Sequence, residues 1–331
     1  MKKITVSAPG KLMLLGEHAV VYNRPCLVTA VDQRMRATVE VLDSPDFLLE
    51  APDVQIGKYK KSMSDLGKGD IPKGAKFVEI VVKNFVEKYQ LQTGLKITTK
   101  SEFSSQFGFG SSSASTVCVV KALSELSGKK LSEKQIFSLA YKTVLDIQGK
   151  GSGFDVAAAT YGGTLSFVNG GKVIEPLHLK SLPLLVGYSG VKADTVTLMN
   201  RVNEKAVHYP AVIEDIYTNI AQVVVLAKKA IVQHDWQIVG ELMDINQGYL
   251  ESLGVSTKKL SAMIYAARDA GAYGAKLSGA GGGDCMIALA PEAKRKVVEK
   301  AITKAEGEVI KVRTNAQGVR VESFDFAQDK K

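Results

Sequence analysis

The sequence has few cysteines and prolines, and it lacks a hydrophobic run long enough to cross a membrane. Only 3 cysteines and 9 prolines occur among its 331 residues. Cys26, Cys118 and Cys285 are odd in number and far apart, which argues against a disulfide framework and suits a reducing compartment. No stretch reaches the roughly 18 consecutive apolar residues of a membrane span, and the first residues lack the apolar core of a signal peptide. We therefore expect a cytoplasmic protein without a membrane partner.

Metal-binding patterns are also scarce. The four histidines are scattered, and no two of them are spaced as H-x-x-x-H. Imidazole and thiolate side chains at short spacing are the usual ligands of transition metals. A dedicated transition-metal site is therefore not expected.

Positive charge is in excess, although it is not concentrated in one segment. Lysine and arginine number 43 against 34 acidic residues, a net charge of +9. Binding to nucleic acid is one interpretation of such a basic chain. However, the lysines are spread along the sequence, and no alternation of aromatic and basic residues suggests single-strand binding. We favour a lysine-rich solvated surface with no nucleic-acid partner, keep a basic RNA-binding protein as the distant alternative, and note that an anionic small substrate also fits.

The order of the elements indicates an α+β fold with two domains. Strand and helix patterns alternate irregularly and without an internal repeat, which favours α+β over a purely parallel sheet. Strands and glycine-rich loops dominate before residue 180, and long helices follow it. This shift predicts domains over 1–180 and 181–331. Apolar spacing predicts helices over 77–90 and 111–127, Ser132 and Gln135 predict a capping box, and 308–312 is expected to pair with 319–322.

Three glycine-rich segments are candidates for function. In the first, Gly10 and Lys11 precede Gly16-Glu17-His18, and a lysine inside an apolar run needs a partner if it is buried. In the second, Phe107 to Ser113, glycines let the backbone approach an anion and serines open a helix whose free N–H groups favour negative charge. A hydroxyl there can also coordinate Mg²⁺, although a flexible turn with a serine cap is the alternative. In the third, glycine fills four of the five positions from 279 to 283, which suggests contact with a ligand or with another loop.

Asp155 follows a fourth glycine-rich stretch, Gly151-Ser152-Gly153. It is either a helix cap or a general base. In the second case Lys11 beside it would keep the carboxylate ionised and help to hold a substrate hydroxyl. Neither a Walker A loop nor the dinucleotide fingerprint is present, because no G-K-[ST] follows a glycine at the required spacing and the third glycine position is Ser113.

In this order, the segments resemble the GHMP kinase family, and the resemblance extends from Pro9 to about Leu289. It implies a two-domain α+β fold, with a ribosomal-protein-like amino-terminal domain, a ferredoxin-like α/β carboxyl-terminal domain and an active site in the cleft between them. It implies ATP and Mg²⁺ as cofactors. A homodimer is suggested by analogy with family members.

Within the family, the resemblance points to two kinds of kinase. Gly16-Glu17-His18-Ala19-Val20-Val21-Tyr22 is similar to mevalonate kinases, as is Gly274-Ala275-Lys276-Leu277. Gly281-Gly282-Gly283-Asp284-Cys285 is more similar to phosphomevalonate kinases. The first implies phosphorylation of the terminal hydroxyl of mevalonate in isoprenoid precursor synthesis, which we favour. Phosphorylation of phosphomevalonate is the alternative.

The resemblance also implies roles for individual residues. Asp155 matches the catalytic aspartate, Lys11 its companion lysine and Ser112 the serine that binds Mg²⁺. The metal-binding glutamate of the family would align with Val144, so we take Asp146, the nearest carboxylate, as a candidate second ligand. The residues expected to bind nucleotide are Phe107, Gly108, Phe109, Gly110, Ser111, Ser112 and Ser113, and those expected to contact substrate are Glu17, His18, Thr195 and Gly281.

Overall fold

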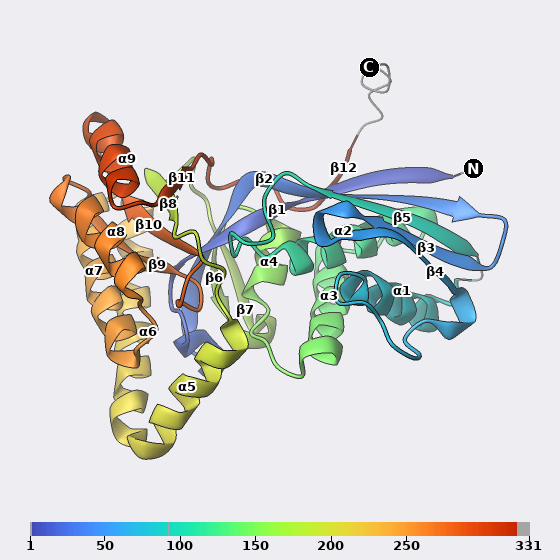
Figure 1. Ribbon diagram of the computed structural model, residues 1–331, viewed down its shortest axis with the longest axis horizontal. Helices are drawn as coiled ribbons and strands as arrows, with labels where there is room; N and C mark the ends of the chain where they lie inside the picture. The colour runs from blue at the N-terminus through green and yellow to red at the C-terminus, as the bar shows by residue number, and fades with distance from the viewer. Residues whose placement is uncertain (1, 92, 323–331) are drawn as a thin grey trace.

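A computed structural model describes residues 2–91 and 93–322, which form two sheets with helices packed on them (Figure 1). The first sheet has eight strands in the order β12-β1-β2-β5-β3-β4, with β6 paired to β2 and β7 paired to β6. Pairing is antiparallel except between β3 and β5. The strands are β1 (Lys3–Leu15), β2 (Pro25–Leu42), β3 (Asp46–Ala51), β4 (Ile56–Ser62), β5 (Gly94–Ser101), β6 (Thr164–Val168), β7 (Val173–Leu177) and β12 (Arg320–Val321).

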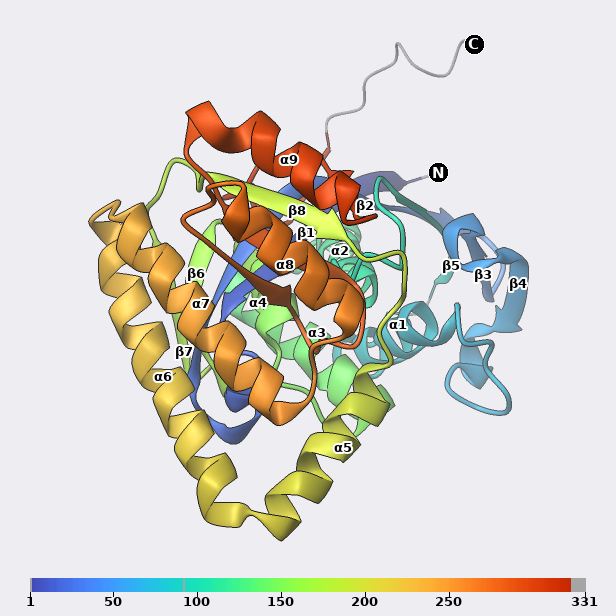
Figure 2. The ribbon, with the colours of Figure 1, turned by 60° about the vertical axis from the view of Figure 1, so that its left-hand side comes forward.

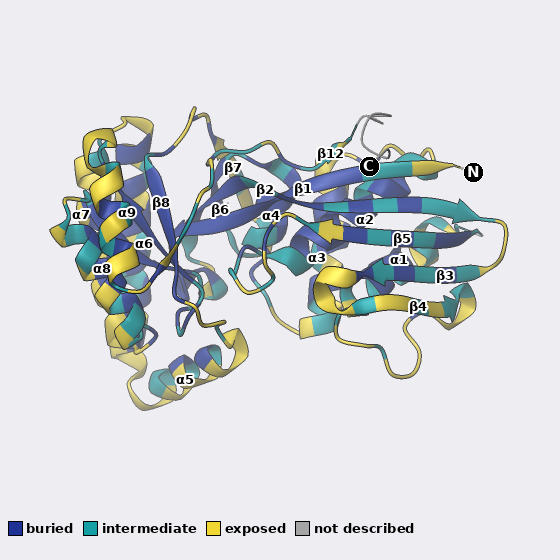
Figure 3. Cartoon of the chain, turned by 45° about the horizontal axis from the view of Figure 1, so that its top comes forward, coloured by how far each residue is buried: buried dark blue, intermediate teal, exposed yellow. Residues whose placement is uncertain are grey.

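Strand β1 supports the candidate site and carries Lys11. The sequence suggests a short strand before Pro9 and Gly10, but the strand continues to Leu15. A register shift between Pro9 and Gly10 accommodates the proline, which has no N–H to donate to the ladder. Every residue of β1 from Val6 onward is buried (Figure 3), and its far end reaches β9 of the second sheet.

Four helices accompany the first sheet. The capping box at Ser132 is confirmed, because the Ser132 hydroxyl accepts from the Gln135 N–H and the Gln135 side chain accepts from the Ser132 N–H. The predicted helices over 77–90 and 111–127 are confirmed to within a residue at each end. The helices are α1 (Lys76–Tyr89), α2 (Ser111–Leu126), α3 (Glu133–Gln148) and α4 (Phe154–Tyr161).

The second sheet is smaller and has the order β11-β8-β10-β9, all antiparallel. Helices α7 and α8 lie against β9. Helix α8 also contacts α9, and Figure 2 shows these two helices side by side. A separate hydrophobic core forms between this sheet and its helices, as the two-domain α+β prediction requires. The elements are β8 (Leu184–Tyr188), α5 (Thr195–His208), α6 (Pro210–Val232), α7 (Trp236–Leu253), α8 (Lys258–Asp269), β9 (Gly274–Ser278), β10 (Cys285–Leu289), α9 (Arg295–Lys304) and β11 (Glu308–Ile310).

Helix α6 is the one helix in the described part of the chain that is long and apolar enough to cross a membrane by length and composition. It is also a packed element, because it contacts α7, α5 and β2. Ile220, Val224 and Ala227 on its inner face are buried.

The end of the described chain returns to the first sheet. The expected pairing of 308–312 with 319–322 is wrong, because β11 pairs with β8 and β12 pairs with β1. Arg320 and Val321, within the predicted second domain, thus pair with a strand of the predicted first domain. The division into 1–180 and 181–331 stays a prediction. Short strands carry little information about their partners, since pairing is decided by contacts between segments far apart in sequence.

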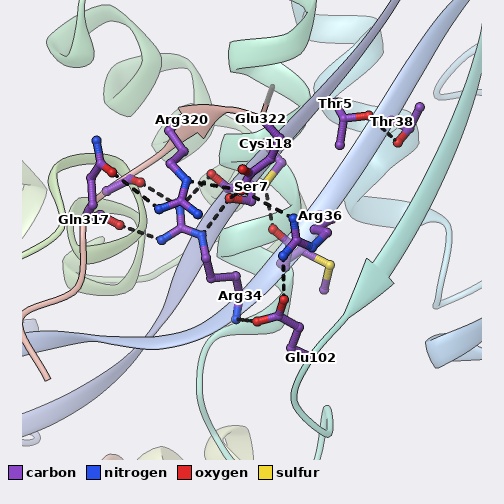
Figure 4. A network of polar contacts seen from close by, with 12 residues as sticks. Thr5, Ser7, Arg34, Arg36, Thr38, Glu102, Cys118, Gln317, Arg320 and Glu322 are labelled. Atoms are coloured by element: carbon purple, nitrogen blue, oxygen red, sulfur yellow. Dashed lines mark hydrogen bonds and ion pairs between the residues drawn. The ribbon is translucent and has the colours of Figure 1, made fainter. Parts of the chain in front are cut away.

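A buried arginine holds this returning segment (Figure 4). The Arg34 guanidinium donates to the Ser7 hydroxyl at 2.6 Å and to the carbonyl oxygens of Gln317 and Gly318, each at 2.8 Å. Burial lowers the pKa of Arg34 to about 10. Because several carbonyl oxygens are satisfied by one side chain, the arginine fixes the segment beside β1.

Candidate active site

Lys11 enters the site from β1. It lies after the register shift, with 9% of its surface exposed. Its Nζ donates to the Gly108 carbonyl oxygen at 2.6 Å and lies 5.3 Å from the centre of the Phe154 ring. The Lys11 backbone N–H donates to the Phe109 carbonyl oxygen at 3.0 Å. The strand and the glycine loop are thus joined through both the backbone and the side chain of one residue.

The loop from Phe107 to Ser113 turns into the first turn of α2. Gly108 and Gly110 have φ values of 71° and 78°, a region that glycine adopts at little cost. Gly110 is the N-cap of α2, and no side chain caps the helix there. The N–H groups of the first turn consequently remain available to an anion, which the helix dipole also favours.

The two phenylalanines of the loop are anchors. Phe109 is almost fully buried and packs against Phe103, and Phe107 lies 5.0 Å from Tyr188 between ring centres. Their side chains are packed into the protein and hold the loop in place. The prediction that all of 107–113 binds nucleotide thus rests on backbone groups at these two positions.

Asp155 lies in the first turn of α4, after Gly153 with φ 88°. Its Oδ2 accepts from the Ser113 hydroxyl at 2.6 Å. A Cβ placed on Gly110 would lie 3.4 Å from Cε of Lys11 and 3.5 Å from Cβ of Asp155, so these two atoms are no farther apart than the sum of those distances. The structure therefore brings Lys11 and Asp155 together beside Gly110, at the N-terminus of α2.

Tyr141 of α3 supports this arrangement and has no signal in the sequence. Its hydroxyl donates to the Gly151 carbonyl oxygen at 2.8 Å, and its ring would collide with a Cβ on Gly153. Burial and the charge of Asp155 raise the pKa of Tyr141. Gly153 is thus needed for close packing as well as for its backbone conformation.

Glu17 and His18 form contacts between the two parts of the chain. Glu17 pairs with Lys276 of β9, and both side chains are fully buried. His18 Nε2 lies 2.9 Å from the Ala280 carbonyl oxygen, and burial lowers the pKa of His18. Their predicted contact with substrate stays a prediction, since their described contacts join the segment after β1 to β9 and to the glycine-rich loop that follows β9.

Two other predicted substrate residues lie around that loop. Gly281 has φ 84°, and a Cβ there would collide with the Val255 carbonyl oxygen. A residue with a side chain would therefore not fit at position 281 without movement of the Val255 backbone. Thr195 is exposed at the start of α5. Contact of either residue with substrate stays a prediction.

No described contact joins Ser112 to Asp146, the two predicted metal ligands. Ser112 lies in the first turn of α2, half-buried. Asp146 is bound by Lys142 of its own helix and by Asn84 of α1, and Val144 is buried. Within 2–91 and 93–322, no three His, Cys, Asp or Glu side chains are grouped to hold a metal ion. The Ser112 hydroxyl, at the end of the loop of 107–113, is a donor that would suit Mg²⁺, which is usually held by one or two protein groups together with phosphates and water. Asp146 stays a prediction.

Asp284 is a further charged group at the loop. It follows the glycine run of 279–283 and itself has φ 54°. Its Oδ1 accepts from the Ala193 N–H at 2.8 Å, and its Oδ2 lies where it would collide with a Cβ on Gly108. Burial raises the pKa of Asp284, although the Ala193 N–H and the charges of Lys11 and Lys192 oppose this shift. The sequence signals Asp284 only as the residue after Gly281-Gly282-Gly283, within the segment similar to phosphomevalonate kinases.

Comparison with known proteins gives a consistent assignment. The GHMP kinases N terminal domain matches residues 76–163, and the GHMP kinases C terminal domain matches residues 227–308. The mevalonate kinase of Pyrococcus abyssi is 37% identical over 96% of this chain and 98% of its own length. The crystal structure of Methanococcus jannaschii mevalonate kinase has a TM-score of 0.80 at 26% identity and covers 94% of this chain and 98% of its own. The phosphomevalonate kinase of Streptococcus pneumoniae, solved with phosphomevalonate and AMPPNP, shares the fold with a TM-score of 0.75 at 20% identity, over 95% of this chain and 100% of its own.

Proposed function

The chain belongs to the GHMP kinase family, and we propose that it transfers the terminal phosphoryl group of ATP to the terminal hydroxyl of mevalonate. It is an ATP-dependent small-molecule kinase, and its product would enter isoprenoid precursor synthesis. The observation that carries the proposal is that Lys11 and Asp155 both lie close to Gly110, next to the uncapped N-terminus of α2. A base, a cation and an anion-binding helix end are the groups that phosphoryl transfer needs in one place.

Each of these groups has a part in the proposed reaction. The N–H groups at the start of α2 bind the phosphates, so we call residues 107–113 the phosphate loop. The Ser113 hydroxyl donates to the Asp155 carboxylate and fixes its position. Asp155 takes the proton of the acceptor hydroxyl, and the Lys11 ammonium stabilises the developing negative charge. Mg²⁺ would be held by the Ser112 hydroxyl together with phosphates and water, and would offset charge on the phosphates. Asp146 stays the candidate second ligand, and it would have to give up its bonds to Lys142 and Asn84. Most of the rate enhancement then comes from positioning and electrostatics.

The choice of acceptor is tested directly by measuring ADP release. Purified protein is assayed in parallel with mevalonate and with 5-phosphomevalonate at equal concentrations. We expect kcat/KM to be far higher with mevalonate. Turnover with phosphomevalonate alone would replace the proposal by the alternative kinase, and ATP-independent retention of RNA without turnover on either compound would favour the RNA-binding interpretation.

Ser112→Ala is expected to raise the concentration of Mg²⁺ needed for half-maximal activity, because it removes a hydroxyl ligand at the phosphate loop. Activity is titrated with Mg²⁺ at fixed ATP. Ser138→Ala, which changes an exposed hydroxyl on α3, is the matched control and should leave the titration unchanged. Asp146→Asn in the same titration tests the candidate second ligand. A metal requirement unaltered by Ser112→Ala would remove that residue from the metal site.

We also propose that the enzyme is cytoplasmic, has no nucleic-acid or membrane partner and forms a homodimer. The proposal of a dimer rests on analogy with the family. Sedimentation of the purified protein at several concentrations measures the oligomeric state, and a monomer at micromolar concentration would contradict it.

A further inference from the structure

The phosphate loop is in contact with a carboxylate that the proposed reaction does not use. Asp284 belongs to the loop between β9 and β10, yet its Oδ2 lies against Gly108, the glycine whose carbonyl oxygen binds Lys11 Nζ. A carboxylate is an unexpected neighbour here, because a triphosphate brought to the same loop carries several negative charges. At distances of a few ångströms, like charges repel each other appreciably even when partly solvated.

The other oxygen of the carboxylate holds a second loop. Asp284 Oδ1 accepts from the Ala193 N–H, and the Asp284 N–H donates to the Val191 carbonyl oxygen at 2.7 Å. These bonds fix 189–194, the segment that leads into α5 and to Thr195. Asp284 therefore contacts both the phosphate loop and the segment that leads to Thr195, a residue predicted to contact the acceptor substrate.

We propose that Asp284 is a positioning residue that ties the phosphate loop to the segment before α5, and that its negative charge weakens the hold on nucleotide and speeds release of ADP. Release of product limits the turnover of many kinases and related enzymes, so a built-in repulsion at the phosphate loop has a plain use. The inference rests on the nucleotide site of the proposed function and is independent of which acceptor is phosphorylated.

The surroundings of Asp284 define how the effect depends on pH. The charged and titratable groups that face it are Lys11 of β1, Lys192 of the segment before α5, Tyr188 of β8 and Cys285 of β10. The pKa of Asp284 is already raised by burial, and bound phosphates would raise it further. Nucleotide binding is then coupled to proton uptake. The Kd for ADP should increase as the pH rises through the pKa of the free enzyme, and should level off above the pKa of the complex.

Two substitutions separate the effect of the Asp284 charge from the effect of its hydrogen bond with the Ala193 N–H. Asp284→Asn removes the charge but keeps an oxygen that can accept from the Ala193 N–H. Asp284→Gly removes both, and glycine adopts the φ of 54° without strain. Both variants should bind MgADP roughly 3- to 30-fold more tightly than the wild type, the range given by one unit charge at a few ångströms. Only Asp284→Gly should also raise the KM for the acceptor.

The decisive measurements are calorimetric titrations with MgADP from pH 5.5 to 8.5 and the dissociation rate of a fluorescent ADP, both without acceptor. We expect ADP to dissociate more slowly from both variants than from the wild type. We also expect the Kd for ADP to lose the rise with pH that the Asp284 carboxyl causes. Asp269→Asn, on the exposed end of α8, removes the same charge elsewhere and should behave as the wild type. Unchanged or weaker ADP binding in Asp284→Asn would overturn the proposal. Weakening seen with MgADP but not with metal-free ADP would instead make Asp284 a metal ligand.

Because the titrations contain no acceptor, they distinguish this inference from the choice of substrate. If neither mevalonate nor phosphomevalonate is phosphorylated but ADP binding responds to Asp284→Asn as described, the proposed function fails and the role of Asp284 stands. If mevalonate is phosphorylated and ADP binding does not respond, the reverse holds.

Discussion

Asp155→Ala is expected to lower kcat by about 10²- to 10⁴-fold, the usual loss when a general base is removed. The Asp155 carboxylate is held by the Ser113 hydroxyl, and Asp155 and Lys11 both lie close to Gly110. Without it, no described group at that point takes the proton as the hydroxyl attacks. The KM for ATP should change little, because the phosphates are bound by the backbone of the loop and by the start of α2. Steady-state kinetics with both substrates varied measures the two effects separately.

Three further variants identify the cause of the loss. Asp155→Asn keeps the shape and can still accept from Ser113, so a loss equal to that of Asp155→Ala would show that charge and basicity matter. Ser113→Ala removes the hydrogen bond alone and should cost much less. Asp215→Asn, on the exposed side of α6, controls for the loss of one negative charge. Turnover within a few-fold of wild type in Asp155→Ala would remove this residue from the role of base.

Local features of the structure could be predicted from the sequence because they depend on neighbouring residues. The capping box of Ser132 and Gln135 needs only a spacing of three, and helix α2 begins where the serines follow Gly110. Gly108 and Gly110 of the phosphate loop have positive φ. Glycine adopts such values at little cost because it has no Cβ, and this is why glycines in a sequence indicate such a loop. These features are set by backbone sterics and short-range hydrogen bonds.

Features that depend on contacts between distant segments could not be predicted in the same way. The two short strands near the end of the chain look like a hairpin, yet β12 joins β1 because Arg34 binds the returning segment. Asp284 reads as the end of a glycine run, and its contact with Gly108 exists only when the two domains are folded together. The partners of a buried charge are likewise invisible until the strands that bear them are placed.

The pair of Glu17 and Lys276 is the plainest case of such a buried charge, and it predicts the largest change in stability. Lys276→Met is expected to lower the free energy of unfolding by about 3–5 kcal/mol, because it leaves the Glu17 carboxylate buried without its cation. Both side chains are fully buried, and burial already lowers the pKa of Lys276. Urea unfolding followed by circular dichroism measures the loss. Lys3→Met, which breaks the exposed pair of Lys3 and Glu40, should cost no more than about 1 kcal/mol.

The double variant Glu17→Gln/Lys276→Met separates the cost of a broken pair from the value of the pair itself. It removes both charges and keeps similar volumes, so most of the stability lost in Lys276→Met should return. Asn246 lies 3.4 Å from the Glu17 carboxylate and can bond to the new amide. A double variant no more stable than Lys276→Met would mean that the two charges do not act as a pair. A stable double variant with a raised KM for the acceptor alone would support the predicted contact of Glu17 with substrate. An unchanged KM would leave the pair as a purely structural connection between the segment after β1 and β9.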